Sequence, residues 1–169
     1  LAGSPYNDRR RSCENVAATI QKLHPERTIK TLRDCTWEDL QEVKSVCSAE
    51  DIQRATFVLG EKDRVLAVCD ALVRDDYEEV GKQMYLTHAG LSKDYEVSCE
   101  ELDFLNDFAK ECGVTGSRIM GGGFGGCTIN LVRNDLYQPF VEKVTAAFEK
   151  RYGHKPQVID VVIGDGARR

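Results

Sequence analysis

The sequence predicts an α+β domain, with a helical N-terminal half followed by a small, mostly antiparallel sheet with packed helices. Two observations carry this prediction. Apolar residues recur at helical spacing from residue 13 to residue 112, and from Val114 onward they alternate with polar residues as in half-buried strands. The length of 169 residues fits one ordinary domain with its own core, so we treat residues 1–169 as a single domain.

Charge and composition exclude several functions. The 23 Lys and Arg residues are outnumbered by 28 Asp and Glu residues, and the net charge of -5 offers no basic surface for nucleic acid. The longest apolar runs, such as residues 161–163, are far shorter than the roughly 20 residues that cross a bilayer. We therefore expect a soluble protein that binds neither nucleic acid nor a membrane.

The cysteines indicate a reducing, cytoplasmic compartment. There are seven of them, an odd number, with no C-x-x-C pair and no histidine at zinc spacing. The sequence begins Leu-Ala-Gly-Ser-Pro without a secretion leader, and we expect part of the working protein to lie outside these residues.

The helical half divides into five expected helices. The first ends where His24 precedes a proline, and the next two begin at the capping patterns of Thr36 and Ser48. The helix after Ser48 is long, and a charged run at residues 61–64 interrupts its apolar face. Its expected apolar positions are Ile52, Ala55, Leu59, Leu66, Cys69 and Val73.

Two further helices complete this half. One opens at Asp75 and Asp76 and carries His88, which we interpret as a core or boundary histidine. The other starts at a capping box headed by Ser98 and stops at Gly113, a glycine of the kind that ends helices.

The second half is expected to read strand, glycine-rich loop, strand, helix, strand. Residues 127–132 and 157–163 alternate as strands. The helix between them has an apolar stripe that includes Phe140 and Val144, and Gly153 closes it.

One segment demands a functional explanation: residues 121–126 hold five glycines in six positions. Glycine costs about 0.5–1 kcal/mol against alanine in regular structure, so such a loop indicates close backbone approach or positive φ. A dinucleotide fingerprint is excluded because a strand, not a helix, follows the loop. A Walker loop is excluded because no Gly-Lys-Ser or Gly-Lys-Thr follows. A plain glycine-rich hairpin turn is the alternative.

The surrounding residues carry more information than the glycines alone. The loop stands within GSRIMGGGFGGCT at residues 116–128, and four more motifs match in order: SPYNDRR at residues 4–10, LRD at 32–34, DYEVSC at 94–99 with ELD at 101–103, and GDGA at 164–167. Together they resemble the galactokinase family of the GHMP kinase superfamily, along essentially the whole chain. Two positions depart from the pattern: Phe57 stands where many relatives have histidine, and Met120 where threonine often precedes the glycines.

The resemblance implies a fold, an activity and a missing partner. The expected fold is the GHMP kinase C-terminal domain, of ferredoxin-like type. Galactokinases phosphorylate the anomeric hydroxyl of α-D-galactose with ATP and Mg²⁺, giving galactose 1-phosphate in galactose metabolism (the Leloir pathway). The family's phosphate loop, catalytic aspartate and arginine partner are all outside this chain. We therefore expect the working partner to be the protein's own N-terminal domain, which would hold most of the ATP and Mg²⁺, and we expect the isolated chain to be inactive.

The same resemblance assigns roles to a few residues here. Tyr6 is expected to hydrogen-bond a galactose hydroxyl, and no catalytic or metal-binding residue is expected in this chain. The glycine-rich loop is expected to support the ATP phosphate loop, through Gly121, Gly122, Gly123, Gly125 and Gly126.

Other charged groups near these motifs receive structural roles. For Arg9 and Arg10 we expect ion pairs on the first helix instead of a phosphate clamp. For residues 94–96 we expect a role in packing or helix capping and no role as base.

Three functions remain open at this point. The first is a galactokinase C-terminal region. The second is a sister kinase acting on N-acetylgalactosamine, arabinose, mevalonate or homoserine. The third is a non-catalytic sensor that binds galactose and ATP.

Overall fold

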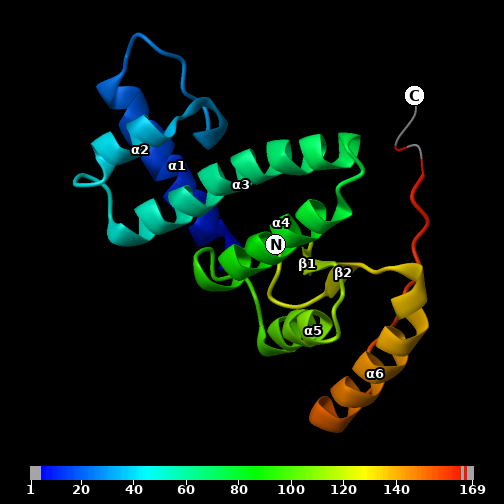
Figure 1. Cartoon of the computed structure of the whole chain (residues 1–169). Coiled ribbons are helices and arrows are strands. Elements are labelled where there is room, and N and C mark those ends of the chain that lie inside the picture. Colours follow the sequence, from blue (N-terminus) through cyan, green and yellow to red (C-terminus); the bar gives the residue numbers. More distant parts are fainter. Residues whose placement is uncertain (1–4, 165, 167–169) are drawn as a thin grey trace.

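The computed structural model describes residues 5–164 and 166, and it has the helix-rich α+β architecture that the sequence predicts. The elements follow the order α1 (Tyr6–Leu23), the 3-10 turn η1 (Leu32–Asp34), α2 (Trp37–Val43), α3 (Ala49–Val73), α4 (Tyr77–Lys93), α5 (Glu100–Glu111), β1 (Gly116–Met120), β2 (Cys127–Leu131) and α6 (Asn134–Tyr152). Figure 1 shows α3 and α4 side by side, with the two strands between α4 and α5.

Local sequence signals set several helix boundaries. Thr36 accepts a hydrogen bond from the Asp39 amide while Asp39 accepts one from the Thr36 amide, so the predicted capping box is confirmed. Ser48 and Asp76 cap α3 and α4. Gly153 follows α6 in the left-handed conformation, with φ of +78°.

The core is divided into clusters. The largest lies where α1, α2 and α3 meet and includes Val16, Ile20, Val43 and Leu59. A second cluster joins α5 to α6, and a third, formed by Phe57, Tyr95 and Val97, joins α3 to the connection between α4 and α5. Among the described residues, no helix combines the length and the apolar character needed to cross a membrane.

The two strands pair antiparallel, from Gly116 opposite Leu131 to Met120 opposite Cys127. The helix α4 packs directly on β1, and two glycines permit the approach. A Cβ on Gly81 would lie 1.9 Å from the Thr115 carbonyl oxygen, and one on Gly116 would lie 2.5 Å from the Gly81 α-carbon. This close packing fixes the hairpin, and with it the glycine-rich loop, against the helical layer.

The predicted strand at residues 157–163 is wrong. After α6 the described chain runs back along that helix without regular structure, and the Tyr137 hydroxyl contacts the Asp160 carboxylate on the way. The side chains of Val161, Val162 and Ile163 are 73–95% exposed. Alternating apolar residues favour a strand, but a strand requires a partner for its backbone N–H and C=O groups, and no described segment supplies one here.

Two smaller predictions also fail. The expected apolar face of α3 is buried at Ala55 and Leu59, whereas Leu66, Cys69 and Val73 are exposed and Ala71 is the buried residue near the end of the helix. The cap of α5 is Cys99, without a side-chain hydrogen bond, because the Ser98 hydroxyl donates to the Asp103 carboxylate at 2.6 Å instead of receiving a backbone amide.

Candidate functional site

Three segments that are far apart in the sequence meet at one place. They are the start of α1, the connecting segment of residues 94–99 between α4 and α5, and the glycine-rich loop of residues 121–126 between β1 and β2. Arg9 on α1 donates to the carbonyl oxygens of Tyr95 and Glu96, and the Val97 carbonyl oxygen accepts from the Phe124 amide at 2.5 Å. Motifs from three parts of the sequence therefore form a single site.

The glycine-rich loop is shaped by its contact with Val97. Gly123 has φ of +79°, and a Cβ there would lie 2.1 Å from the Val97 carbonyl oxygen. Its neighbour Phe124 also has positive φ, +58°. A side chain at position 123 would be strained and would collide with backbone, so only glycine fits.

The rest of the loop is open. An added Cβ on Gly121, Gly125 or Gly126 would meet no described atom within 4 Å. The loop therefore contacts Val97 through Gly123 and Phe124 and presents bare backbone at Gly121, Gly125 and Gly126, a shape that permits close approach by a ligand or by another backbone.

The connecting segment is held by aromatic packing on one side. Tyr95 is buried, with its ring 5.1 Å from the Phe57 ring and 6.1 Å from the Tyr6 ring, the latter in an edge-on arrangement. Burial raises the pKa of the Tyr95 hydroxyl far above its ordinary value of 10.0, and it raises the pKa of the neighbouring Cys13 thiol as well. Tyr95 therefore stays neutral and acts in packing, as the sequence analysis expects.

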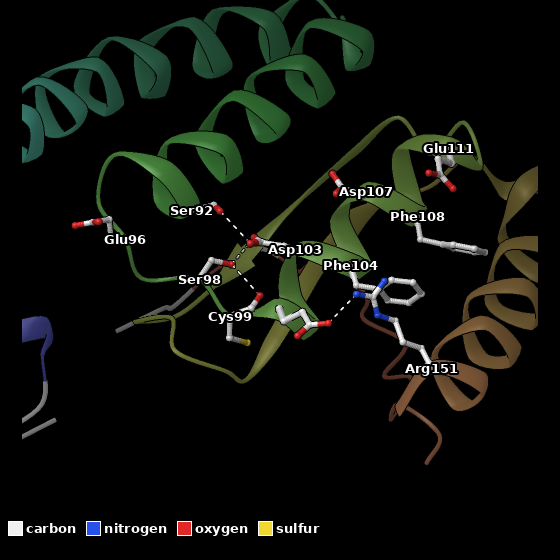
Figure 2. A pocket seen from close by; sticks show the side chains of 11 residues that line it. Ser92, Glu96, Ser98, Cys99, Asp103, Phe104, Asp107, Phe108, Glu111 and Arg151 are labelled. Carbon is white, nitrogen blue, oxygen red and sulfur yellow. Dashed lines mark hydrogen bonds and ion pairs between the residues drawn. The ribbon is translucent and has the colours of Figure 1, made fainter. Parts of the chain in front are cut away.

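Asp103 holds the other side of the segment. Its carboxylate accepts hydrogen bonds from Ser98 at 2.6 Å, from Ser92 at 3.0 Å and from His88 Nε2 at 3.1 Å, and Figure 2 shows the two serine hydroxyls directed at it. Burial lowers the pKa of His88, with Asp103 opposing the shift, so the imidazole is neutral near pH 7 and Nε2–H is the donor. Three side chains thus fix the approach to α5 through one carboxylate.

A groove of about 680 Å³ lies beside this cluster, between α5 and the last turn of α6 (Figure 2). Its lining is mixed: it includes the acidic residues Glu100, Asp107 and Glu111 of α5 together with the rings of Phe104 and Phe108. Arg151 of α6 pairs with Glu100 at 2.7 Å. Within residues 5–164 and 166, no three His, Cys, Asp or Glu side chains are grouped so as to hold a metal ion.

The structure places the expected sugar-binding residue next to this site. Tyr6 is the first residue of α1 and is half-buried against Tyr95. Within the described part of the chain, no hydrogen bond to its hydroxyl is found. The motif residues Ser4, Asp165 and Ala167 lie outside the described residues.

The residues that join the motifs could not be identified from sequence patterns. The expectation of helix ion pairs holds for Arg10, which pairs with Glu14 at 2.7 Å, but it is wrong for Arg9. Besides a long hydrogen bond of 3.4 Å to the Pro5 carbonyl oxygen at the start of its own helix, Arg9 donates to two backbone carbonyls 86 and 87 residues later. The one sequence signal for this role is that Arg9 stands in the same motif as Tyr6.

A known protein family matches about half of the chain. Residues 69–150 match the family described as GHMP kinases C terminal. The match runs from the second half of α3 to the end of α6 and includes both the connecting segment and the glycine-rich loop.

More specifically, the chain is similar along its whole length to part of several galactokinases. It is 42% identical over 172 residues to the galactokinase of Clostridium beijerinckii and 35% identical over 170 residues to that of Thermotoga maritima, and both alignments cover 100% of this chain. The crystal structure of Lactococcus lactis galactokinase complexed with galactose superimposes with a TM-score of 0.76 at 29% identity, covering 90% of this chain and 39% of that one. The chain spans 43% of the length of the Clostridium protein and 45% of the Thermotoga protein.

Proposed function

We propose that this chain works as the C-terminal part of a galactokinase, which transfers a phosphoryl group from ATP to the anomeric hydroxyl of α-D-galactose and yields galactose 1-phosphate. The observation that carries the proposal is the convergence of Tyr6, the connecting segment and the glycine-rich loop. They belong to three of the five motifs by which the chain resembles galactokinases, and they form one site although they are far apart in sequence.

The glycine-rich loop supports the nucleotide side of this site. Its backbone is bare at Gly121, Gly125 and Gly126, so the phosphate loop of an N-terminal domain, or the ATP phosphates themselves, can approach it closely. Mg²⁺ bound with ATP would neutralise charge on the phosphates, and we place its ligands in the N-terminal domain and the nucleotide. Phosphoryl transfer depends mostly on positioning and charge stabilisation, and positioning is what a docked loop supplies.

Tyr6 orients the sugar in this proposal. Tyr95 packs edge-on against its ring, which leaves the hydroxyl as the polar tip of an otherwise packed side chain. Tyr6→Phe removes one hydrogen bond to the sugar, worth about 1 kcal/mol, and should raise the KM for galactose roughly fivefold while the KM for ATP is unchanged. Tyr77→Phe, a change at an exposed tyrosine of α4, is the control. An unchanged galactose KM in Tyr6→Phe would remove Tyr6 from the sugar site.

The test of the function uses what we call the joined protein: this chain together with the N-terminal part of its own polypeptide. We expect galactose-dependent release of ADP, weaker release with arabinose, N-acetylgalactosamine, mevalonate or homoserine, and none from the 169-residue chain alone. Binding of galactose and ATP without turnover would replace the kinase by a sensor. Faster turnover of a comparator would move the protein to a sister kinase.

We place this activity in the cytoplasm. All seven cysteines are free thiols in the structure, which supports a reducing compartment. The partner that the site lacks is the protein's own N-terminal domain.

A further inference from the structure

We propose that Arg9 is a positioning residue for the glycine-rich loop. Its guanidinium fixes the backbone of the connecting segment at Tyr95 and Glu96, and through Val97 the connecting segment holds the loop. The link from loop position to catalysis rests on the proposed function, whereas the link from Arg9 to the loop does not.

Arg9 donates hydrogen bonds to two consecutive backbone carbonyl groups. Nε donates to the Tyr95 oxygen at 3.0 Å, and a terminal nitrogen donates to the Glu96 oxygen at 2.8 Å. Only 13% of the side chain is exposed. A planar guanidinium with several fixed donors can hold two carbonyls at once, which the single ammonium of a lysine does less well.

The gripped backbone is strained, so it needs this support. Glu96 has φ of +54°, a left-handed conformation that residues with a Cβ rarely adopt. Its carboxylate lies 3.6 Å from the buried Arg54 and 3.9 Å from Arg9. Arg54 therefore holds Glu96 by the Glu96 carboxylate alone, whereas Arg9 holds it by both the carboxylate and the backbone carbonyl oxygen.

The connecting segment fixes the position of the glycine-rich loop through Val97. The Val97 carbonyl oxygen, next in the chain after Glu96, accepts the Phe124 amide at 2.5 Å and is the atom against which Gly123 packs. Arg9 also reaches the loop directly, with its guanidinium carbon 5.6 Å from the centre of the Phe124 ring. The same side chain thus touches the loop and the segment that supports it.

Hydrogen exchange of the Phe124 amide in the 169-residue chain tests this coupling. In Arg9→Gln we expect that amide to exchange about tenfold faster, while the amides of the β1–β2 ladder keep their protection. Arg9→Lys should fall between Arg9→Gln and the unmodified chain. Arg10→Gln is the matched control, because it removes only the exposed pair with Glu14, and its Phe124 amide should exchange at the unmodified rate.

Two results would overturn the positioning role. One is unchanged Phe124 exchange in both Arg9 variants. The other is equal acceleration of Phe124 and of the β1–β2 ladder in both variants, which would indicate a general loss of stability.

Kinetics of the joined protein test the link to catalysis separately. Arg9→Gln should lower kcat about tenfold with the KM for galactose within twofold, and Arg9→Lys should recover part of the loss. If Phe124 exchange responds and kcat does not, the catalytic link fails while the structural coupling stands. If the unmodified joined protein has no kinase activity, the proposed function fails, and exchange still decides the role of Arg9.

Discussion

Gly123→Ala tests whether the contact between the glycine-rich loop and Val97 fixes the loop. A left-handed φ of +79° costs alanine about 1–2 kcal/mol. The added Cβ would lie 2.1 Å from the Val97 carbonyl oxygen, and relieving an overpacked contact costs about 1–3 kcal/mol. Moving the loop also breaks the hydrogen bond from the Phe124 amide, worth about 0.5–1.5 kcal/mol. The whole effect should be about 2.5–6.5 kcal/mol.

Gly121→Ala is the matched control for this variant. Gly121 has a similar φ of +86°, but no described atom lies within 4 Å of the Cβ that alanine would add. It should therefore lose only the conformational part, about 1–2 kcal/mol. The two variants share the strain and differ in the contact.

Urea denaturation followed by circular dichroism compares the free energies of unfolding of the two variants. The loop can also detach without unfolding the domain, and then the cost is seen as faster exchange of the Phe124 amide, measured in the same samples. Equal free energies of unfolding together with equal exchange rates in the two variants would refute the reasoning.

Two further predictions concern the scaffold around the site. Arg27 holds the pKa of the Asp39 carboxyl at about 2, below its ordinary value of 3.8, so this carboxylate stabilises the fold by about 2 kcal/mol above pH 4 and loses that contribution as the pH falls toward 2. Arg27→Gln should flatten the decline in stability over this range, and thermal melts from pH 5 to pH 2 would show it; an equally steep decline would contradict the assignment. Gly81→Ala should destabilise by several kcal/mol because its Cβ would lie 1.9 Å from the Thr115 carbonyl oxygen. Gly60→Ala, in the middle of α3, should stabilise the fold by up to about 1 kcal/mol, because the atoms nearest to its added Cβ belong to the flexible end of an arginine side chain. Thermal melts compare the two alanine variants with the unmodified chain. If both variants melt above it, or both below it, these predictions are wrong.

The parts of the fold that could be predicted from the sequence are those set by neighbouring residues. The caps at Thr36 and Asp76 and the helix end at Gly153 depend on groups within a few residues, so their patterns are sufficient. Ser98 resembles the same pattern, but its hydroxyl turns to Asp103, an acceptor that a capping rule does not weigh. Residues 157–163 alternate as a strand should, yet pairing is a property of two segments, and one segment cannot reveal it.

The candidate site shows the same division. The glycines of residues 121–126 announce a special loop, and the observed positive φ at Gly123 confirms the expected backbone. The role of Arg9 could not be found in this way, because its acceptors are backbone carbonyls, which every residue has. A motif identifies the residues that belong to the site. Which of them contact each other, such as Arg9 and Tyr95 at a separation of 86 residues, can be seen only in the folded structure.

Left-handed backbone at Glu96 and Phe124 limits how far this protein can be stabilised by engineering. Glycine at either position would relieve about 1 kcal/mol of strain, and a search for more stable variants would select it. Such a gain would remove the Glu96 carboxylate from between two arginines, or the Phe124 ring from beside Arg9. A thermostable variant that carries glycine at either position would keep its fold and lose the order of its loop, so stability and activity should be scored separately at these two residues.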